Sequence, residues 1–120
     1  MCAKPLSNYL RTYRKRAGLT QKELAFLLGC QSGAKVSRYE NVQRLPNLNT
    51  VFAYEVIFNI PANQLFAGIY ENAKEKVEQR AILLLKDWKS VPVPEHKIVL
   101  VHSIFNDPDY LISKLNELDK

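Results

Sequence analysis

Long hydrophobic runs are missing from this 120-residue sequence. The longest apolar stretches, residues 81–85 and 98–101, fall far short of the roughly 20 residues that a helix needs to cross a bilayer. The first five residues, Met-Cys-Ala-Lys-Pro, lead into a polar and basic stretch without the apolar segment of a secretory signal. We therefore expect no membrane-spanning segment and a cytoplasmic location.

The sequence has only two cysteines, Cys2 and Cys30, and neither lies at the spacing of a metal site. In a reducing cytoplasm both should remain thiols. Cys30 stands in a predicted turn, where a redox switch is one reading, but no local feature predicts a reactive thiolate and we favour a small, partly buried side chain. His96 and His102 have no acidic or cysteine partner at ligand spacing. We expect no metal site.

Motifs of enzymatic chemistry are lacking as well. The sequence has four glycines and contains no glycine-rich phosphate loop, no nucleophile elbow and no paired acids in a recognisable frame. We therefore predict that the protein is not an enzyme and uses no cofactor.

Positive charge is present in excess, and it is concentrated in the first half. The net charge is +5. Residues 1–60 hold nine basic and three acidic side chains, whereas residues 61–120 hold eight basic and nine acidic ones. The proportions of hydrophobic and charged residues, 47% and 24%, are those of a folded globular protein. A basic half beside a near-neutral half suggests a polyanion partner for the first and another task for the second.

Helical periodicity and end signals predict five helices in the first half. Gly18 and Gly29 supply helix ends, and Thr20 followed by Glu23 is a capping-box pattern. Ser32 can cap the next helix, with Val36 and Tyr39 pointing inward from it. The helices are expected over residues 7–17, 21–28, 33–41 and 49–58, with a short fifth ending near residue 66.

The second half predicts further helices. Apolar residues recur at steps of three and four over a long helix from about residue 68 to 89, namely Ile69, Ala73, Val77, Ala81, Leu84, Leu85 and Trp88. Pro92 and Pro94 interrupt this pattern. Residues 97–105 are rich in β-branched side chains, so a strand is possible, but we favour a helix because no second strand is predicted. A last helix can begin at Pro108. The fold class is therefore predicted as all-α.

Two short helices joined by a tight turn form a helix-turn-helix, whose second helix can enter the major groove of DNA. The stretch Leu10-Arg-Thr-Tyr-Arg-Lys-Arg-Ala-Gly-Leu-Thr-Gln-Lys-Glu-Leu-Ala, followed by Val36-Ser-Arg-Tyr-Glu, closely resembles the Cro/CI-like, xenobiotic-response-element family of bacterial and phage regulators. Residues 46–66 resemble its last two helices. The resemblance implies a five-helix, lambda-repressor-like DNA-binding domain over residues 1–67 and a helical extension over residues 68–120. It implies a transcriptional regulator, leaving repressor or activator open.

The resemblance also implies which residues contact DNA. Gln21 would bond a phosphate and brace the recognition helix, and Arg44 would hold the DNA backbone. On the groove face, Arg38 or Lys35 could donate to guanine and Ala34 could meet a thymine methyl group. The implied DNA-binding residues are Thr20, Gln21, Gln31, Ser32, Ala34, Lys35, Ser37, Arg38 and Arg44. By the same resemblance, Arg14 and Glu40 form a structural ion pair instead of facing DNA.

Three departures from the family pattern leave questions open. The turn from residue 29 to 36 is one residue longer than usual, so the cap at Ser32 and the groove-facing register could shift by one. Val42 replaces a common glycine, and because a β-branched residue suits a left-handed helix end poorly, we expect Asn41 to take that conformation. Glu55 lies near the core, where a carboxylate needs a partner that the sequence does not identify.

The apolar side chains after residue 67 exceed what a five-helix domain needs for its own core. We expect them to hold a homodimer that reads an inverted repeat in double-stranded DNA, although they could instead pack on the first domain of the same chain. A different class of function also stays open: an antitoxin-like or adaptor module that binds a protein partner through residues 68–120.

Overall fold

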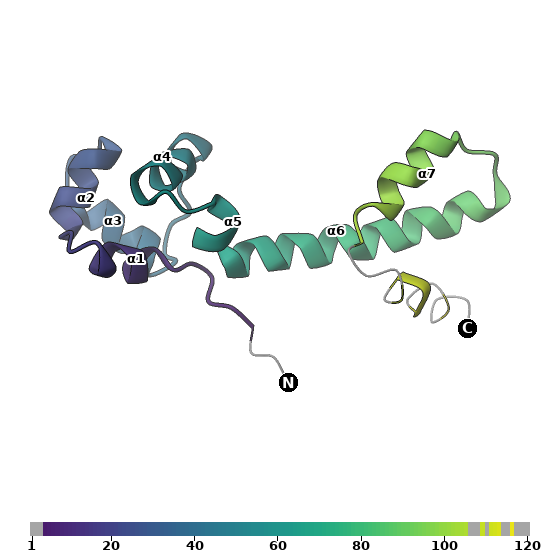
Figure 1. Ribbon diagram of the computed structural model, residues 1–120, viewed down its shortest axis with the longest axis horizontal. Helices are drawn as coiled ribbons and strands as arrows, with labels where there is room; N and C mark the ends of the chain where they lie inside the picture. The colour runs from purple at the N-terminus through teal and green to yellow at the C-terminus, as the bar shows by residue number, and fades with distance from the viewer. Residues whose placement is uncertain (1–3, 106–108, 110, 114–115, 117–120) are drawn as a thin grey trace. The chain divides into compact units, whose positions relative to one another are not determined.

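The computed structural model describes residues 4–105, 109, 111–113 and 116, and within these ranges every regular element is a helix. The prediction of an all-α fold is confirmed (Figure 1). The helices are α1 (Leu10–Arg16), α2 (Gln21–Leu28), α3 (Gly33–Glu40), α4 (Leu48–Phe58), α5 (Ala62–Leu65), α6 (Ala67–Asp87), the 3-10 helix η1 (Trp88–Ser90) and α7 (Glu95–His102). None of the described helices is long and apolar enough to cross a membrane.

The chain divides into two compact units, which we call the N-terminal unit (residues 1–71) and the C-terminal unit (residues 72–120). The division falls inside α6, four residues beyond the boundary expected from the sequence. Each unit has its own core of buried apolar side chains. The two are therefore described separately.

Local signals account for both ends of α2. The Thr20 hydroxyl accepts a hydrogen bond from the Glu23 amide at 3.0 Å, and the Glu23 carboxylate accepts one from the Thr20 amide at 2.9 Å. The bond from the Thr20 amide to the charged carboxylate is the main cause that lowers the pKa of Glu23, and the Thr20 side chain adds to it. Gly29 ends the helix with a left-handed φ of 78°. The capping box and the glycine end predicted for residues 21–28 are both confirmed.

The start of α1 differs from the prediction, because the helix begins at Leu10 instead of Ser7. The residues before it bond to the junction of α5 and α6: Leu65 accepts from the Tyr9 amide at 2.8 Å, and the Leu6 carbonyl accepts from the Gly68 amide at 2.8 Å. A Cβ on Gly68 would lie 2.5 Å from that carbonyl oxygen, so only glycine allows this approach. Residues 6–9 thus lie outside α1 because they bond to the start of α6 and the end of α5.

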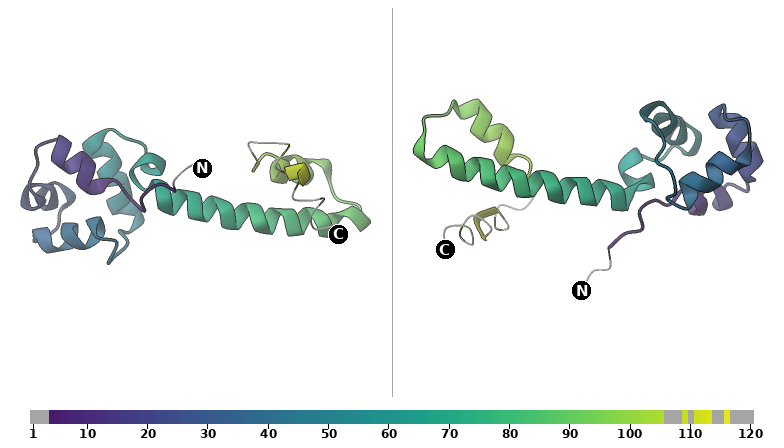
Figure 2. Two further views of the ribbon diagram at one scale, coloured as in Figure 1. Left: turned by 90° about the horizontal axis from the view of Figure 1, so that it is seen from below. Right: turned by 180° about the vertical axis from the view of Figure 1, so that it is seen from behind.

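The core of the N-terminal unit is built around Tyr54 of α4, which is fully buried. Its ring meets Tyr39 of α3 edge-on at 6.4 Å between centroids, and Phe66 similarly at 6.2 Å. Val36 and Tyr39 are buried, as predicted for the inner face of α3. Figures 1 and 2 show α1 to α5 gathered into one group around this core.

The core of the C-terminal unit lies between the second half of α6 and α7. Its buried side chains are Ala81, Ile82, Leu85, Val101, Phe105 and Leu111. The preference for a helix over a strand in residues 97–105 is confirmed, with α7 starting directly after Pro94. Part of the predicted α6 stripe is not buried, since Ala73, Val77 and Leu84 are exposed. Most of the last predicted helix lies outside the described residues.

Glu55 has a partner that the sequence did not identify. Its carboxylate accepts a hydrogen bond from the Ala62 amide at 2.8 Å. Ala62 is the first residue of α5, whose first-turn amides have no partner within the helix. Glu55 therefore joins α4 to the start of α5, and a carboxylate near the core is stabilised by a backbone donor.

The left-handed residue after α3 is Val42, with a φ of 59°, and the expectation that Asn41 would take this conformation is wrong. Asn41 has a φ of −91°. The amides of Gln43 and Arg44 both donate to the Arg38 carbonyl, at 2.9 and 3.3 Å. These bonds close the end of α3 and require the reversal at Val42 despite the cost of a β-branched side chain there.

Replacing Val42 with glycine should stabilise the protein by about 1 kcal/mol, because glycine takes a positive φ without strain and Val42 is exposed. We expect a rise of about 4–8 °C in the Tm of the N-terminal unit. Thermal unfolding followed by circular dichroism measures this. Asn41→Gly is the matched control, since its φ is already negative. A Val42→Gly protein that melts at or below the parent Tm would show that the positive φ of Val42 costs no stability.

Candidate nucleic-acid interface

The turn between α2 and α3 is tightly closed. Beyond Gly29, the Cys30 amide donates to the Ala25 carbonyl at 2.8 Å, and α3 begins three residues later at Gly33. A Cβ on Gly33 would lie 3.3 Å from both the Gln21 Cβ and the Lys22 nitrogen. Glycine therefore lets the start of α3 lie close against the start of α2.

Ser32 occupies the N-cap position of α3 with an extended backbone, but its hydroxyl makes no capping hydrogen bond. The sequence-based prediction of a side-chain cap at Ser32 is therefore wrong. The predicted start of α3 at Gly33 is nevertheless confirmed, because the helix is held by the buried side chains of Val36 and Tyr39. Packing replaces the missing cap.

A buried polar network fixes the end of α3. The Arg14 Nε donates to Glu40 Oε2 at 2.6 Å and its Nη2 to Oε1 at 3.1 Å, while Nη1 donates to the Leu19 carbonyl at 3.0 Å. Gln21 Nε2 also donates to Glu40 Oε1, at 3.2 Å. The hydrogen bonds to Glu40 raise the pKa of Arg14 above its already high ordinary value. One carboxylate thus joins α1, α2 and α3.

The pair between Arg14 and Glu40 faces inward, with side chains that are only 11% and 2% exposed. Arg14 is therefore unavailable to a ligand at the surface. Asn8 adds a contact that the sequence analysis missed: its Nδ2 donates to the Tyr39 carbonyl at 3.0 Å, and its Oδ1 accepts from the Leu10 amide at 3.2 Å. The available signal was an asparagine near the expected start of a helix, where this residue type often bonds to the first backbone amides.

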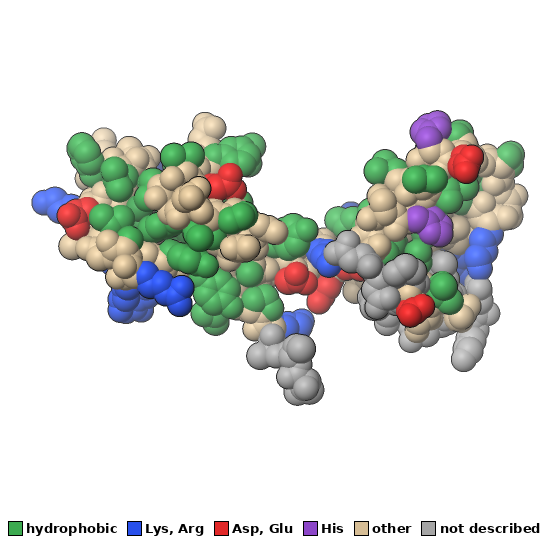
Figure 3. All heavy atoms as spheres, in the orientation of Figure 1, with side chains coloured by type: hydrophobic (Ala, Val, Ile, Leu, Met, Phe, Trp, Pro, Cys, Tyr) green, Lys and Arg blue, Asp and Glu red, His purple; other side chains and the backbone are tan. Residues whose placement is uncertain are grey.

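The outer face of α3 is open to solvent. Ala34 and Arg38 are exposed, four residues apart, and Ser37 and Lys35 beside them are half-buried. The Asn41 Nδ2 donates to the Ser37 hydroxyl at 3.4 Å. Thr20, Gln31, Ser32 and Arg44 are also exposed, and Gln21 is half-buried because of its bond to Glu40. Lys and Arg side chains gather on the edge of the N-terminal unit near α1 and α3 (Figure 3).

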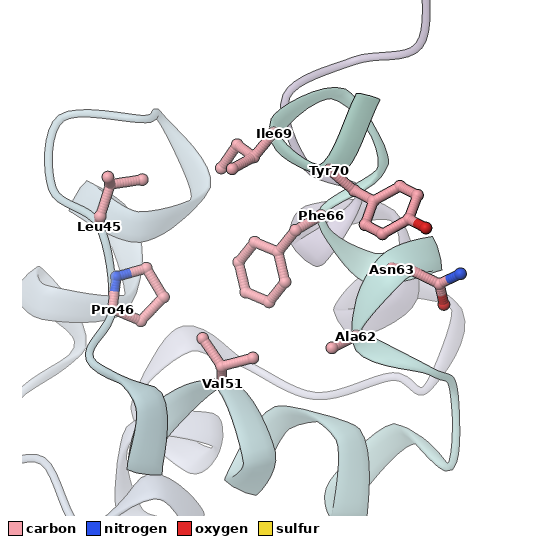
Figure 4. A pocket seen from close by; sticks show the side chains of 8 residues that line it. All are labelled: Leu45, Pro46, Val51, Ala62, Asn63, Phe66, Ile69 and Tyr70. Atoms are coloured by element: carbon pink, nitrogen blue, oxygen red, sulfur yellow. The ribbon is translucent and has the colours of Figure 1, made fainter. Parts of the chain in front are cut away.

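An apolar pocket of about 290 Å³ opens beside the loop that follows Arg44 (Figure 4). Phe66 points into it, and Pro46 stands on the opposite wall. Its lining is Leu45, Pro46, Val51, Ala62, Asn63, Phe66, Ile69 and Tyr70. None of these lining residues carries a charged side chain. Across the described ranges, no cluster of three or more His, Cys, Asp or Glu side chains could hold a metal ion.

Comparison with protein families gives a match to the helix-turn-helix domain over residues 5–55. The matched residues contain α1, α2, α3 and most of α4, and thus the whole of the tight turn and the buried network. Comparison with curated proteins and with solved structures gives no significant match. The tight turn between α2 and α3 and the family match agree that residues 5–55 are similar to a helix-turn-helix domain, the kind of domain that DNA-binding regulators carry.

Proposed function

We propose that the protein is a sequence-specific transcriptional regulator that reads double-stranded DNA with α3 in the major groove. The observation that carries this proposal is the division of α3 into two faces. Val36, Tyr39 and Glu40 anchor the inner face, while Ala34 and Arg38 leave the outer face free for base edges. The sequence resemblance to Cro/CI-like regulators supports the same reading.

The contacts are divided between bases and phosphates. Arg38, with Lys35 at the side of the helix, donates to guanine, and Ala34 meets a thymine methyl group. Arg44 is held beside the end of α3 by the hydrogen bond from its backbone amide to the Arg38 carbonyl, and it contacts the DNA backbone. Gln21 braces Glu40 and reaches a phosphate with the rest of its amide. Thr20, Gln31, Ser32 and Ser37 complete the proposed interface.

Selection of binding sites from random duplexes by the full chain tests this function. We expect one enriched inverted repeat, bound more tightly than random DNA, with an affinity that falls steeply as salt concentration rises. Failure to enrich any sequence, together with equal binding to all duplexes, would refute sequence-specific reading. It would favour the adaptor alternative.

We also propose that the C-terminal unit joins two copies in a homodimer. α7 buries Val101 but leaves Val99 and Leu100 exposed, and α6 exposes Leu83 and Leu84. These apolar side chains lie on a unit with a small core of its own, which a second copy would enlarge. A twofold dimer would place two α3 helices in successive major grooves, about 34 Å apart.

Sedimentation of the full chain tests the dimer. We expect the parent to be dimeric and Leu100→Glu to be largely monomeric, because the substitution would bury an unpaired charge in the contact. His96→Glu, also on α7 and exposed, is the control that introduces the same charge. A monomeric parent, or a Leu100→Glu protein as dimeric as the control, would refute this interface.

A further inference from the structure

The apolar pocket beside the loop that follows Arg44 is built from segments that are distant in the sequence. Leu45 and Pro46 come from that loop, and Val51 comes from α4. Phe66, at the junction of α5 and α6, points into the pocket toward Pro46 (Figure 4). Phe66 is only 7% exposed, whereas Leu45 is 65% exposed. The hollow, which we call the Phe66 pocket, therefore runs from an open edge to a buried aromatic ring.

The walls of the Phe66 pocket are held by bonds that lie outside it. On one side, the Gly68 amide donates to the Leu6 carbonyl at 2.8 Å, which fixes the first turn of α6. On the other side, Asn47 Oδ1 accepts from the Thr50 amide at 2.9 Å, which fixes the start of α4 just after the loop. A site whose walls are already fixed loses little conformational entropy when a ligand enters. The pocket is therefore formed before any ligand binds, as small-molecule sites usually are.

The size of the Phe66 pocket limits its occupant. A volume of about 290 Å³ holds about ten non-hydrogen atoms, at the roughly 30 Å³ that each takes in a liquid. A stable protein contact buries about 800 Å² on each partner, which is far more surface than a group of this size covers. The pocket therefore fits a small molecule with a single ring better than it fits a protein segment.

The lining determines the chemistry of that molecule. None of the lining side chains is charged, so an ionised ligand would lose hydration without gaining a partner. The Phe66 ring favours an aromatic ligand, while the exposed Asn63 and Tyr70 place an amide and a phenol on the side away from Leu45 (Figure 4). We propose that the Phe66 pocket binds a small, uncharged aromatic molecule with one hydroxyl group for hydrogen bonding to Asn63 and Tyr70.

Titration of the isotope-labelled full chain with benzyl alcohol, followed by NMR, tests the site. We expect saturable shifts of the Ala62, Phe66 and Ile69 amides, with a Kd on the order of 1 mM because so small a ligand gains only modest affinity. Benzoate and benzylammonium have nearly the same size and carry opposite charges, and both should bind at least about tenfold more weakly. Benzoate that binds as tightly as benzyl alcohol would overturn the assignment to an uncharged ligand.

Two variants locate the bound ligand. Ala62→Leu fills the pocket and should weaken benzyl alcohol binding by about tenfold or more. Leu45→Ala removes an exposed part of the wall, which leaves the core intact, and should weaken binding by about three- to tenfold. The matched controls are Ala17→Leu and Leu48→Ala, which make the same changes at exposed positions outside the pocket and should bind as the parent does.

Benzyl alcohol that shows no saturable binding below about 20 mM, or pocket variants that bind it as tightly as the parent, would overturn the proposal. An equal loss for Ala17→Leu or Leu48→Ala would overturn it too, because the effect would then not come from the pocket. If benzyl alcohol does not bind but Leu45→Ala changes the sedimentation of the full chain, the pocket belongs to a protein contact instead. None of these measurements uses DNA, so they succeed or fail independently of the proposed function.

Discussion

Replacing Glu40 with alanine is expected to lower the free energy of unfolding by about 3–5 kcal/mol. The Glu40 side chain is 2% exposed and accepts hydrogen bonds from Arg14 and Gln21. Its removal leaves the Arg14 guanidinium buried with only the Leu19 carbonyl as a partner. Breaking a buried pair in this way strands a charge that water cannot solvate. Urea unfolding at neutral pH measures the loss.

The matched control is Lys15→Ala in the same region of α1, where the exposed side chain should change stability by no more than about 0.5 kcal/mol. The double variant Arg14→Met with Glu40→Leu should lose much less than the two single changes combined, because it removes both charges and retains apolar volume. A Glu40→Ala protein that unfolds at the same urea concentration as the parent would show that the pair contributes nothing to stability.

Replacing Arg38 with alanine should relax base preference at one position of the selected site by about 10- to 100-fold, because a bidentate contact to guanine discriminates by about 1–3 kcal/mol. Arg44→Ala should instead weaken binding to all sequences alike and reduce the slope of affinity against salt by about one. Fluorescence anisotropy on the selected site, its single-base variants and random duplexes distinguishes these effects.

Arg11→Ala supplies the control for lost charge, because Arg11 is exposed on α1 and has no proposed DNA contact. Arg11→Ala should change the base preference less than Arg38→Ala does. It should also change the salt slope less than Arg44→Ala does. If Arg38→Ala and Arg44→Ala both reduce specific and random binding equally, the proposed register of α3 on DNA is wrong. Arg38 would then serve as another phosphate contact.

Short-range features of the sequence determined the helical elements. The capping box of Thr20 and Glu23 and the glycine at position 29 defined both ends of α2, because each acts through bonds to its own neighbours in the chain. Apolar spacing alone identified the inner residues Val36 and Tyr39 of α3. The exposed positions of that helix follow from the same periodicity, although their contacts with DNA stay predictions.

Only the tertiary structure decided the features in which distant segments meet. Residues 6–9 lie outside α1 because they bond to the α5–α6 junction, and Glu55 is stabilised by the start of α5. Val42, not Asn41, is left-handed because the loop amides must reach the Arg38 carbonyl. In each case the deciding energy comes from a partner that local propensity does not include.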